Sequence, residues 1–180
     1  GGGSMNAASI LRYIIQKRII KIKKKQILEI TKNIGSDVIL GLESTNLILS
    51  SKNKIISFKN CKKLFTLIVK PNFGCSTKYI YSRVKKFDKI KFDKPNREMF
   101  KFDFLKTMQN SLEQIAFTKY SVLKKIKSYL SNLENPIFVR MSGSGSAIVS
   151  YYYSKKQCDK AQKQVNKHFK NYWCISSKTI

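Results

Sequence analysis

The sequence has 180 residues, enough to bury the core of one domain and part of a second. Its 36 lysine and arginine residues greatly outnumber its 10 aspartate and glutamate residues, giving a formal net charge of +26. No apolar run is long enough to cross a bilayer, and four well-separated cysteines with one histidine match no familiar zinc spacing. We therefore expect a soluble, cytoplasmic protein with reduced thiols, no membrane contact and no zinc centre.

The positive charge comes mainly from lysine, because only five of the basic residues are arginine. Arginine forms bidentate contacts with phosphates and guanine edges, whereas lysine is a hydrated point charge. Lysines are spread along the whole chain and are densest over residues 17–25. This distribution is typical of solvated surfaces, so we predict no specific nucleic-acid partner. A basic nucleic-acid-binding module stays the alternative of another class.

The first third of the chain shows two helical patterns followed by strand-like runs. Apolar residues recur with helical spacing from Ala7 to Ile20, which predicts the first helix. A second helix is predicted over residues 26–34, ending at Gly35 because glycine commonly follows the last helical residue. Three short apolar runs then predict strands, at residues 46–50, 54–58 and 64–69.

The middle of the chain is predicted to be mostly helical. After a turn at residues 70–74, residues 76–84 predict a short helix with Ser76 or Thr77 as its N-cap. Residues 85–104 are polar with interspersed phenylalanines and are expected to be irregular. Residues 105–133 contain one or two further helices, since apolar side chains return at helical intervals.

The final third of the chain predicts a strand at residues 137–141, a glycine turn at 142–146 and a second strand at 147–153. A helix at residues 155–169 and a last strand at 172–177 follow. No repeat of fixed period appears. These elements predict an α+β fold in which an antiparallel sheet packs against helices on one face.

The first chemical motif is GGGSMNAA, residues 1–8, which leads directly into the first helix. Consecutive glycines let backbone N–H groups approach an anion closely, and a helix N-terminus adds unpaired donors and a favourable dipole. The motif therefore predicts a phosphate site, to which the Ser4 hydroxyl can contribute. A flexible linker of the same composition is the alternative.

Two further motifs are weak individually. Asp37, in the segment GSDV, lies between a helix-ending glycine and an apolar stretch, where a partly desolvated carboxylate suits a general base. A simple turn-capping role is the alternative. In RMSGSGSAIVS, residues 140–150, Gly143 and Gly145 separate two strands, so the turn can present N–H groups to an anion or be an ordinary glycine hairpin.

Taken together and in order, five segments resemble the GHMP kinase superfamily, most closely its branch acting on a diphosphocytidyl methylerythritol in non-mevalonate isoprenoid synthesis. Residues 1–8 are similar to the end of that family's ATP loop, G-G-G-S-S-x-A-A, with Met5 replacing the second serine. GSDV resembles G-A/S-D-V-P, with Ile39 replacing the proline. The other three are PNFGCST, resembling P-G-x-x-x-x-T; QNSLE at residues 109–113, resembling R-N-D-L-E; and RMSGSG, resembling R-L-T-G-S/T-G.

The resemblance implies transfer of the γ-phosphoryl group of ATP, with Mg²⁺, to an alcohol of that substrate. It implies a general-base or orienting role for Asp37 and contact of Thr77 with the acceptor substrate. No protein ligand for the metal is implied beyond weak candidates at Ser4 and Asn6. The expected phosphate-binding residues are Gly1, Gly2, Gly3, Ser4, Gly143, Ser144 and Gly145.

Because the chain opens inside a glycine run without an initiator methionine, we expect an incomplete copy that is inactive alone. The resemblance implies that the absent part carries a lysine and part of the nucleotide site. Residues 1–60 are expected to be the remainder of an N-terminal ATP-binding domain, and residues 61–180 a ferredoxin-like C-terminal domain. Another GHMP kinase, acting on homoserine or a mevalonate-type alcohol, and a folded but inactive remnant stay open as alternatives. The oligomeric state is not predicted.

Overall fold

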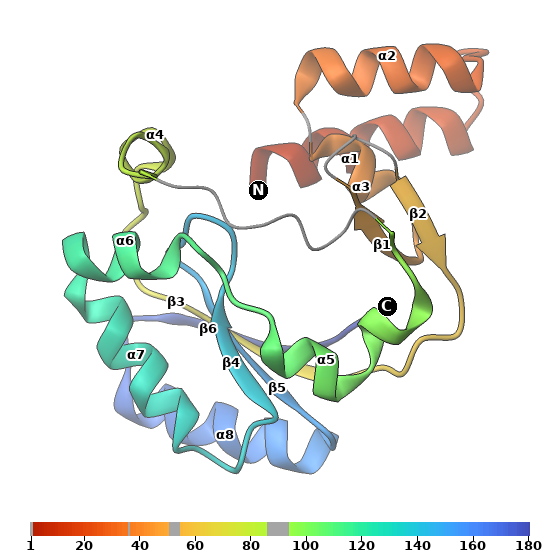
Figure 1. Ribbon diagram of the computed structural model, residues 1–180. Helices are drawn as coiled ribbons and strands as arrows, with labels where there is room; N and C mark the ends of the chain where they lie inside the picture. Colours follow the sequence, from red (N-terminus) through yellow and green to blue (C-terminus); the bar gives the residue numbers. More distant parts are fainter. Residues whose placement is uncertain (1, 36, 51–54, 86–93) are drawn as a thin grey trace. The chain divides into compact units, whose positions relative to one another are not determined.

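The computed structural model describes every residue except 1, 36, 51–54 and 86–93 (Figure 1). The described residues form two compact units, one within residues 1–60 and the other within residues 61–179. Lys94, Pro95 and Ile180 group with the first unit. The assignment of these parts to an ATP-binding domain and a C-terminal kinase domain stays a prediction.

The first unit contains helices α1 (Gly2–Gln16), α2 (Lys24–Ile34) and α3 (Val38–Leu42) and an antiparallel hairpin of β1 (Asn46–Leu49) and β2 (Ile55–Phe58). Gly35 ends α2 and donates its N–H to the Thr31 carbonyl over 3.0 Å, as the sequence predicted. The first helix begins earlier and ends sooner than expected. Arg18 adopts a left-handed conformation, with φ of 52°, which ends the helical path before Ile20.

Packing of α1 against α3 forms the centre of this unit. Ala8, Leu11 and Val38 are almost completely buried. A Cβ atom placed on Gly41 would lie 2.6 Å from the Ala8 Cβ, so the two helices can approach this closely only with a glycine at that position. The sequence did not predict α3, because five residues are too few to show a helical period.

The second unit is organised by a four-stranded antiparallel sheet in the order β4-β5-β3-β6. Along the chain, β3 (Phe65–Lys70) is followed by helices, by the pair β4 (Phe138–Met141) and β5 (Ile148–Tyr152), by another helix and by β6 (Trp173–Lys178). This connectivity and strand order are ferredoxin-like. The predicted α+β class with an antiparallel sheet is therefore confirmed.

Helices cover one face of this sheet, where Figure 1 shows α7 (Ser121–Ser131) and α8 (Lys155–His168) lying side by side along the strands. Alternate strand residues such as Leu67, Val69 and Ile148 point to that face and are fully buried. They form one core with apolar side chains of the helices, which are Ala116, Leu123, Ile126, Leu130, Cys158, Ala161 and Val165. Ala116 belongs to α6 (Glu113–Lys119).

The segment expected to be irregular, residues 85–104, is only partly described. Its described part contains a 3₁₀ helix, η1 (Arg97–Phe100), and the start of α5 (Phe102–Thr107), so the prediction is wrong there. Tertiary contacts order it: the Phe102 ring packs edge-on against Tyr153, with centroids 5.2 Å apart, and Lys62 lies over the same ring. The spacing of polar and apolar residues within the segment gives no indication of these distant partners.

The short helix after the turn is confirmed as α4 (Thr77–Ser82). The Ser76 hydroxyl accepts a hydrogen bond from the Tyr79 N–H over 3.2 Å, which makes Ser76 the N-cap. None of the helices in the described part of the chain is both long and apolar enough to span a membrane.

Candidate active site

In the first unit, two of the five predicted segments are neighbours in space. Gly2, Gly3 and Ser4 form the first turn of α1, where backbone N–H groups have no acceptor within the helix. The Ser4 Oγ lies 3.8 Å from the position of a Cβ on Gly35. The glycine loop and the GSDV segment therefore meet, although Gly1 lies outside the described residues.

Asp37 occupies the N-cap position of α3. Its side chain makes no capping hydrogen bond to that helix, while the next residue, Val38, is completely buried. The turn-capping role stays an alternative. Asp37 itself is exposed within its unit, whereas the sequence suggested partial burial. The structure thus places Asp37 at the start of α3, next to a residue of the core of this unit.

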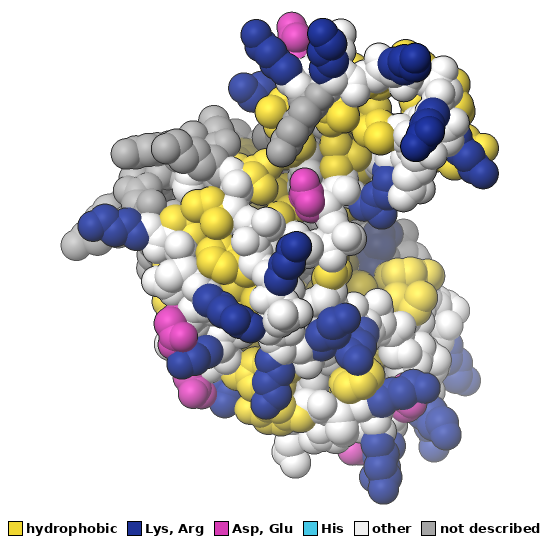
Figure 2. All heavy atoms as spheres, turned by 90° about the vertical axis from the view of Figure 1, so that its right-hand side faces the viewer, with side chains coloured by type: hydrophobic (Ala, Val, Ile, Leu, Met, Phe, Trp, Pro, Cys, Tyr) yellow, Lys and Arg dark blue, Asp and Glu magenta, His cyan; other side chains and the backbone are white. Residues whose placement is uncertain are grey.

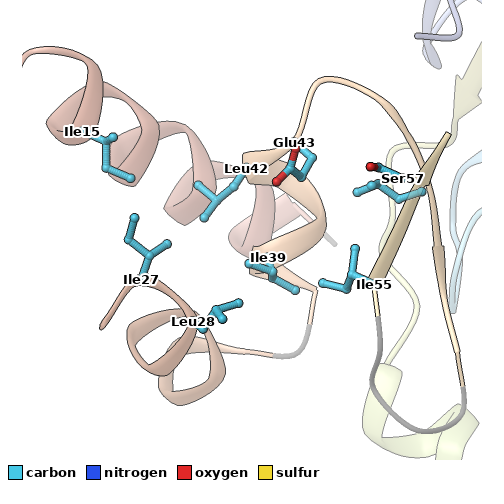
Figure 3. A pocket seen from close by; sticks show the side chains of 9 residues that line it. Ile15, Ile27, Leu28, Ile39, Leu42, Glu43, Ile55 and Ser57 are labelled. Atoms are coloured by element: carbon cyan, nitrogen blue, oxygen red, sulfur yellow. The ribbon is translucent and has the colours of Figure 1, made fainter. Parts of the chain in front are cut away.

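A pocket that the sequence did not predict lies inside the first unit and has a volume of about 610 Å³. Figure 3 shows side chains from all three helices and from β2 pointing toward it, with the Glu43 carboxylate at its side. A second pocket of about 340 Å³ shares Leu28, Ile39 and Ile55 with the first and reaches Gly35. Both pockets are lined mainly by apolar side chains, and Asp37 lines neither of them. They therefore contain few polar groups that could bind a phosphate.

In the second unit, the turn at residues 142–146 connects β4 to β5. Gly143 and Gly145 have φ of 53° and 88°, a region that residues with a side chain rarely adopt. The turn is fixed internally, since Ser142 N–H donates to Ala147 O and Gly145 N–H donates to Ser142 O, both over 2.9 Å. We refer to residues 142–146 as the glycine turn.

The PNFGCST segment, residues 71–77, lies directly against the glycine turn. The hydroxyls of Thr77 and Ser144 form a hydrogen bond of 2.8 Å, and Ser146 Oγ donates to the Phe73 carbonyl over 2.6 Å. A Cβ on Gly145 would lie 3.0 Å from the Cys75 Sγ. The structure therefore brings the predicted substrate residue Thr77 into contact with the predicted phosphate loop.

The QNSLE segment, residues 109–113, contacts the other side of the same turn. Asn110 Nδ2 donates to the carbonyls of Met141, over 2.9 Å, and Gly143, over 2.7 Å. Glu113 Oε1 accepts from the Met141 N–H over 2.6 Å, and its Oε2 pairs with Lys127 Nζ at 2.5 Å. The sequence matched this segment to the family but gave it no role.

The end of β4 is further anchored by Arg140, whose guanidinium donates to the carbonyls of Leu105 and Met108. Burial lowers the pKa of this guanidinium, an effect opposed by Tyr151 and by the negative charge of Glu113. Burial also raises the pKa of the Cys75 thiol, which makes Cys75 a poor nucleophile at neutral pH. Polar side chains of α6 and α7 line an open hollow of about 750 Å³ beside Asn110 and Glu113.

No cluster of three or more His, Cys, Asp or Glu side chains that could hold a metal ion occurs among the described residues. On the face drawn in Figure 2, the lysine and arginine side chains are scattered, some of them in small groups, and do not form one continuous stripe.

The fold is that of GHMP-type kinases. The chain superposes on a crystal structure of 4-(cytidine 5'-diphospho)-2C-methyl-D-erythritol kinase with a TM-score of 0.77 and 20% identity, covering 98% of this chain and 65% of that one. A homoserine kinase from Cytophaga hutchinsonii matches with a TM-score of 0.63 and 16% identity, over 89% of this chain and 58% of that one. At these identities the likeness shows the fold alone.

Sequence similarity points to one kinase in particular. The chain is 55% identical, over all 180 residues, to the 4-diphosphocytidyl-2-C-methyl-D-erythritol kinase of Pelagibacter ubique and covers 64% of that protein. Kinases of the same name from Clostridium botulinum and Petrotoga mobilis are 35% and 34% identical over 160 and 162 residues, which are 84% and 86% of this chain and 56% and 62% of those proteins. No family model matches the sequence.

The chain is therefore a homologue of 4-diphosphocytidyl-2-C-methyl-D-erythritol kinases, and the resemblance seen in its five segments is confirmed. It spans between 56% and 64% of the length of these relatives.

Proposed function

We propose that this chain carries the catalytic and phosphate-binding segments of an ATP-dependent kinase that phosphorylates the methylerythritol 2-hydroxyl of 4-diphosphocytidyl-2-C-methyl-D-erythritol, in isoprenoid biosynthesis. The observation that carries the proposal is the meeting of three predicted segments, residues 71–77, 109–113 and 140–146, at one glycine turn. The similarity to kinases of that name supports the choice of substrate. The activity belongs to the whole protein of which these segments are part.

The phosphates of ATP are bound by backbone N–H groups in this proposal. Gly2, Gly3 and Ser4 supply donors at the start of α1, where the helix dipole also favours negative charge. Gly1, also predicted to bind phosphate, lies outside the described residues. The glycine turn, with Gly143, Ser144 and Gly145, supplies the second set. Binding through backbone donors suits a chain whose arginines are few, because preorganised amides need no flexible side chain.

Asp37 accepts the proton of the attacking hydroxyl or orients that hydroxyl in line with the γ-phosphorus, and Thr77 contacts the acceptor substrate. Phosphoryl transfer through a loose transition state depends on alignment and charge neutralisation more than on covalent help. A carboxylate fixed at the start of α3 and a threonine bonded to the glycine turn are both suited to alignment.

Mg²⁺ fits the described residues only as a partner of the nucleotide, since these residues contain no cluster of carboxylates, histidines or cysteines that would hold it alone. Magnesium commonly keeps several waters and binds substrate phosphates with one or two protein oxygens. The Ser4 hydroxyl and the Asn6 amide oxygen are the candidates near the first glycine segment. When bound, the ion neutralises phosphate charge.

The test of Asp37 is its replacement in the full-length protein. Asp37→Asn should lower kcat by at least about a thousandfold, because proton transfer and alignment are both lost, while ATP affinity changes less than about threefold. ADP release coupled to NADH oxidation measures kcat, and equilibrium titration measures the affinity for ATP. Asp103→Asn, at an exposed carboxylate of α5, is the matched control. Survival of activity in Asp37→Asn would remove Asp37 from the mechanism.

The substrate is tested with the same assay by offering the diphosphocytidyl alcohol, homoserine and mevalonate separately. We expect ADP release only with the first. Release with homoserine instead would assign the chain to another kinase of the same fold. Binding to RNA that persists without ATP and falls steeply with salt would favour the nucleic-acid alternative.

A further inference from the structure

The glycine turn contains one backbone donor, the Ser144 N–H, whose direction can be derived from the hydrogen bonds around it. None of the described residues accepts a hydrogen bond from it, although the Ser144 hydroxyl is bonded to Thr77. Ser144 as a whole residue is half-buried. A backbone donor in this situation is available to a ligand anion, and its usefulness depends on where it points.

That direction is set by Asn110. A trans peptide unit is planar, and its C=O and N–H groups point in opposite directions. The Gly143 carbonyl and the Ser144 N–H belong to one such unit. Because Asn110 Nδ2 holds this carbonyl at 2.7 Å, the Ser144 N–H is turned away from Asn110. The peptide unit between Met141 and Ser142, two units earlier, behaves alike: Asn110 also holds the Met141 carbonyl, and the Ser142 N–H points to the Ala147 carbonyl.

Glu113 anchors the end of β4, where the glycine turn begins. Its Oε1 accepts the Met141 N–H over 2.6 Å, and its other oxygen pairs with Lys127 of α7, a helix packed in the core. The Glu113 side chain is only 14% exposed, so these bonds compete little with water. Figure 1 shows the β4–β5 turn beside the start of α6, from which Asn110 and Glu113 reach it.

We propose that Asn110 and Glu113 are positioning residues that aim the Ser144 N–H at a phosphate of the nucleotide. The backbone hydrogen bonds inside the glycine turn are donated by Ser142 and Gly145, and neither of them holds the peptide unit between Gly143 and Ser144. Asn110, just before α6, holds this unit through the Gly143 carbonyl, and Glu113, in α6, holds the end of β4, so both act before the ligand arrives. This inference rests on the proposed function, because it takes the nucleotide triphosphate as the anion.

Asn110→Asp separates positioning from a role in starting α6. The aspartate keeps an oxygen for the Leu112 N–H, which Asn110 Oδ1 accepts over 3.0 Å, but it lacks the NH₂ group that faces two carbonyls. Glu113→Gln keeps an acceptor for Met141 and loses only the charge facing Lys127, whereas Glu113→Ala loses both. Gln114→Ala, at an exposed neighbour on α6, is the control.

Two measurements on the 180-residue chain test the proposal. The first is the ¹⁵N–¹H shift of Ser144 on addition of Mg·ATP and, separately, of tripolyphosphate. The second is amide exchange at Ser142 and Gly145 without ligand, with β3 amides as an internal reference. We expect a ligand-induced Ser144 shift in the wild type, in Glu113→Gln and in Gln114→Ala. In Asn110→Asp and Glu113→Ala we expect Mg·ATP affinity to fall about tenfold and turn exchange to rise about tenfold, with β3 exchange unchanged.

The outcomes separate the positioning role of Asn110 and Glu113 from the proposed phosphate site itself. If Asn110→Asp binds Mg·ATP as the wild type does, or if β3 exchange rises as much as that of the turn, the positioning role is overturned and the contacts are merely structural. If the wild type shows no Ser144 shift with either probe, the proposed phosphate site fails. The exchange data would then still show whether Asn110 and Glu113 order the turn, and an unchanged turn in both variants would overturn that as well.

Discussion

Three glycines near the candidate site differ in the space and backbone conformation that they require. Gly74 has open space where a Cβ would lie and no left-handed φ, Gly143 has open space but φ of 53°, and Gly145 has φ of 88° with sulfur atoms of Cys75 and Met141 at 3.0 Å. Each difference is a property of one residue, and together they form a graded series.

Alanine at these positions should therefore destabilise the protein in order. We expect a change in the free energy of unfolding within about 0.5 kcal/mol for Gly74→Ala, a loss of about 1–2 kcal/mol for Gly143→Ala from backbone strain, and about 2–4 kcal/mol for Gly145→Ala, where crowding adds. Urea unfolding measures all three. Equal losses at Gly143 and Gly145 would show that the contacts with Cys75 and Met141 relax without cost.

Two thiols of the second unit make stability depend on alkaline pH. Burial, with the charge of Asp159, raises the pKa of the Cys158 thiol to about 11, and burial raises that of Cys174 to about 11, from ordinary values near 9. Because the folded state keeps protons that the unfolded chain releases, their contribution is complete below pH 9 and is lost as pH rises toward 11.

Urea unfolding between pH 8 and pH 11 should show this decline, and Cys158→Ala should make it shallower, although its stability at pH 8 is lower because a cavity is left. Each thiol accounts for at most about 1.4 kcal/mol per pH unit in this window. Lysine titration acts equally on both proteins and cancels in the comparison. Parallel curves would mean that Cys158 ionises in the folded protein as freely as in the unfolded chain.

At the scale of elements, the close approach of α1 and α3 is what joins the first two predicted segments. Gly41 permits it, since a Cβ there would overlap Ala8 at 2.6 Å and meet the Met5 side chain at 3.0 Å. The same contact brings the first turn of α1 beside Gly35 and the start of α3, where Asp37 lies.

Gly41→Ala should thus separate the two helices and cost about 1–3 kcal/mol, despite the better helix propensity of alanine. The matched change is Gly3→Ala, in α1, where nothing lies within 4 Å of the new Cβ and stability should stay equal or rise by up to about 1 kcal/mol. Amide exchange in α1 measures the change in stability for both variants. A neutral Gly41→Ala would show that the helices can part without loss.

At the scale of the whole molecule, charge dominates. Ten acidic residues can neutralise at most ten of the 36 basic ones, so most lysines repel one another. Raising NaCl from about 20 to about 300 mM shortens the screening length from about 20 Å to about 6 Å and should raise the melting temperature by several degrees. Sucrose is the uncharged control. A melting temperature that does not respond to salt would mean that this repulsion is negligible.

Local sequence patterns determined most of the elements. The strands of both sheets, the end of α2 at Gly35 and the cap of α4 by Ser76 follow from short-range preferences, because glycine and serine act on backbone groups only a few residues away. The prediction for the α5 segment failed for the opposite reason. The contacts that order the segment are a cation–π contact from Lys62, a guanidinium hydrogen bond from Arg140 and a ring contact from Tyr153, all distant in sequence.

The order of five short motifs also determined the kinase resemblance, since matched segments in sequence need no coordinates. Only the tertiary structure decided what those segments do to one another. Asn110, Glu113 and Thr77 meet the glycine turn through hydrogen bonds across 28 to 67 residues of sequence. No periodicity encodes such pairs, because hydrogen-bond partners are chosen by the path of the folded backbone and not by spacing along the chain.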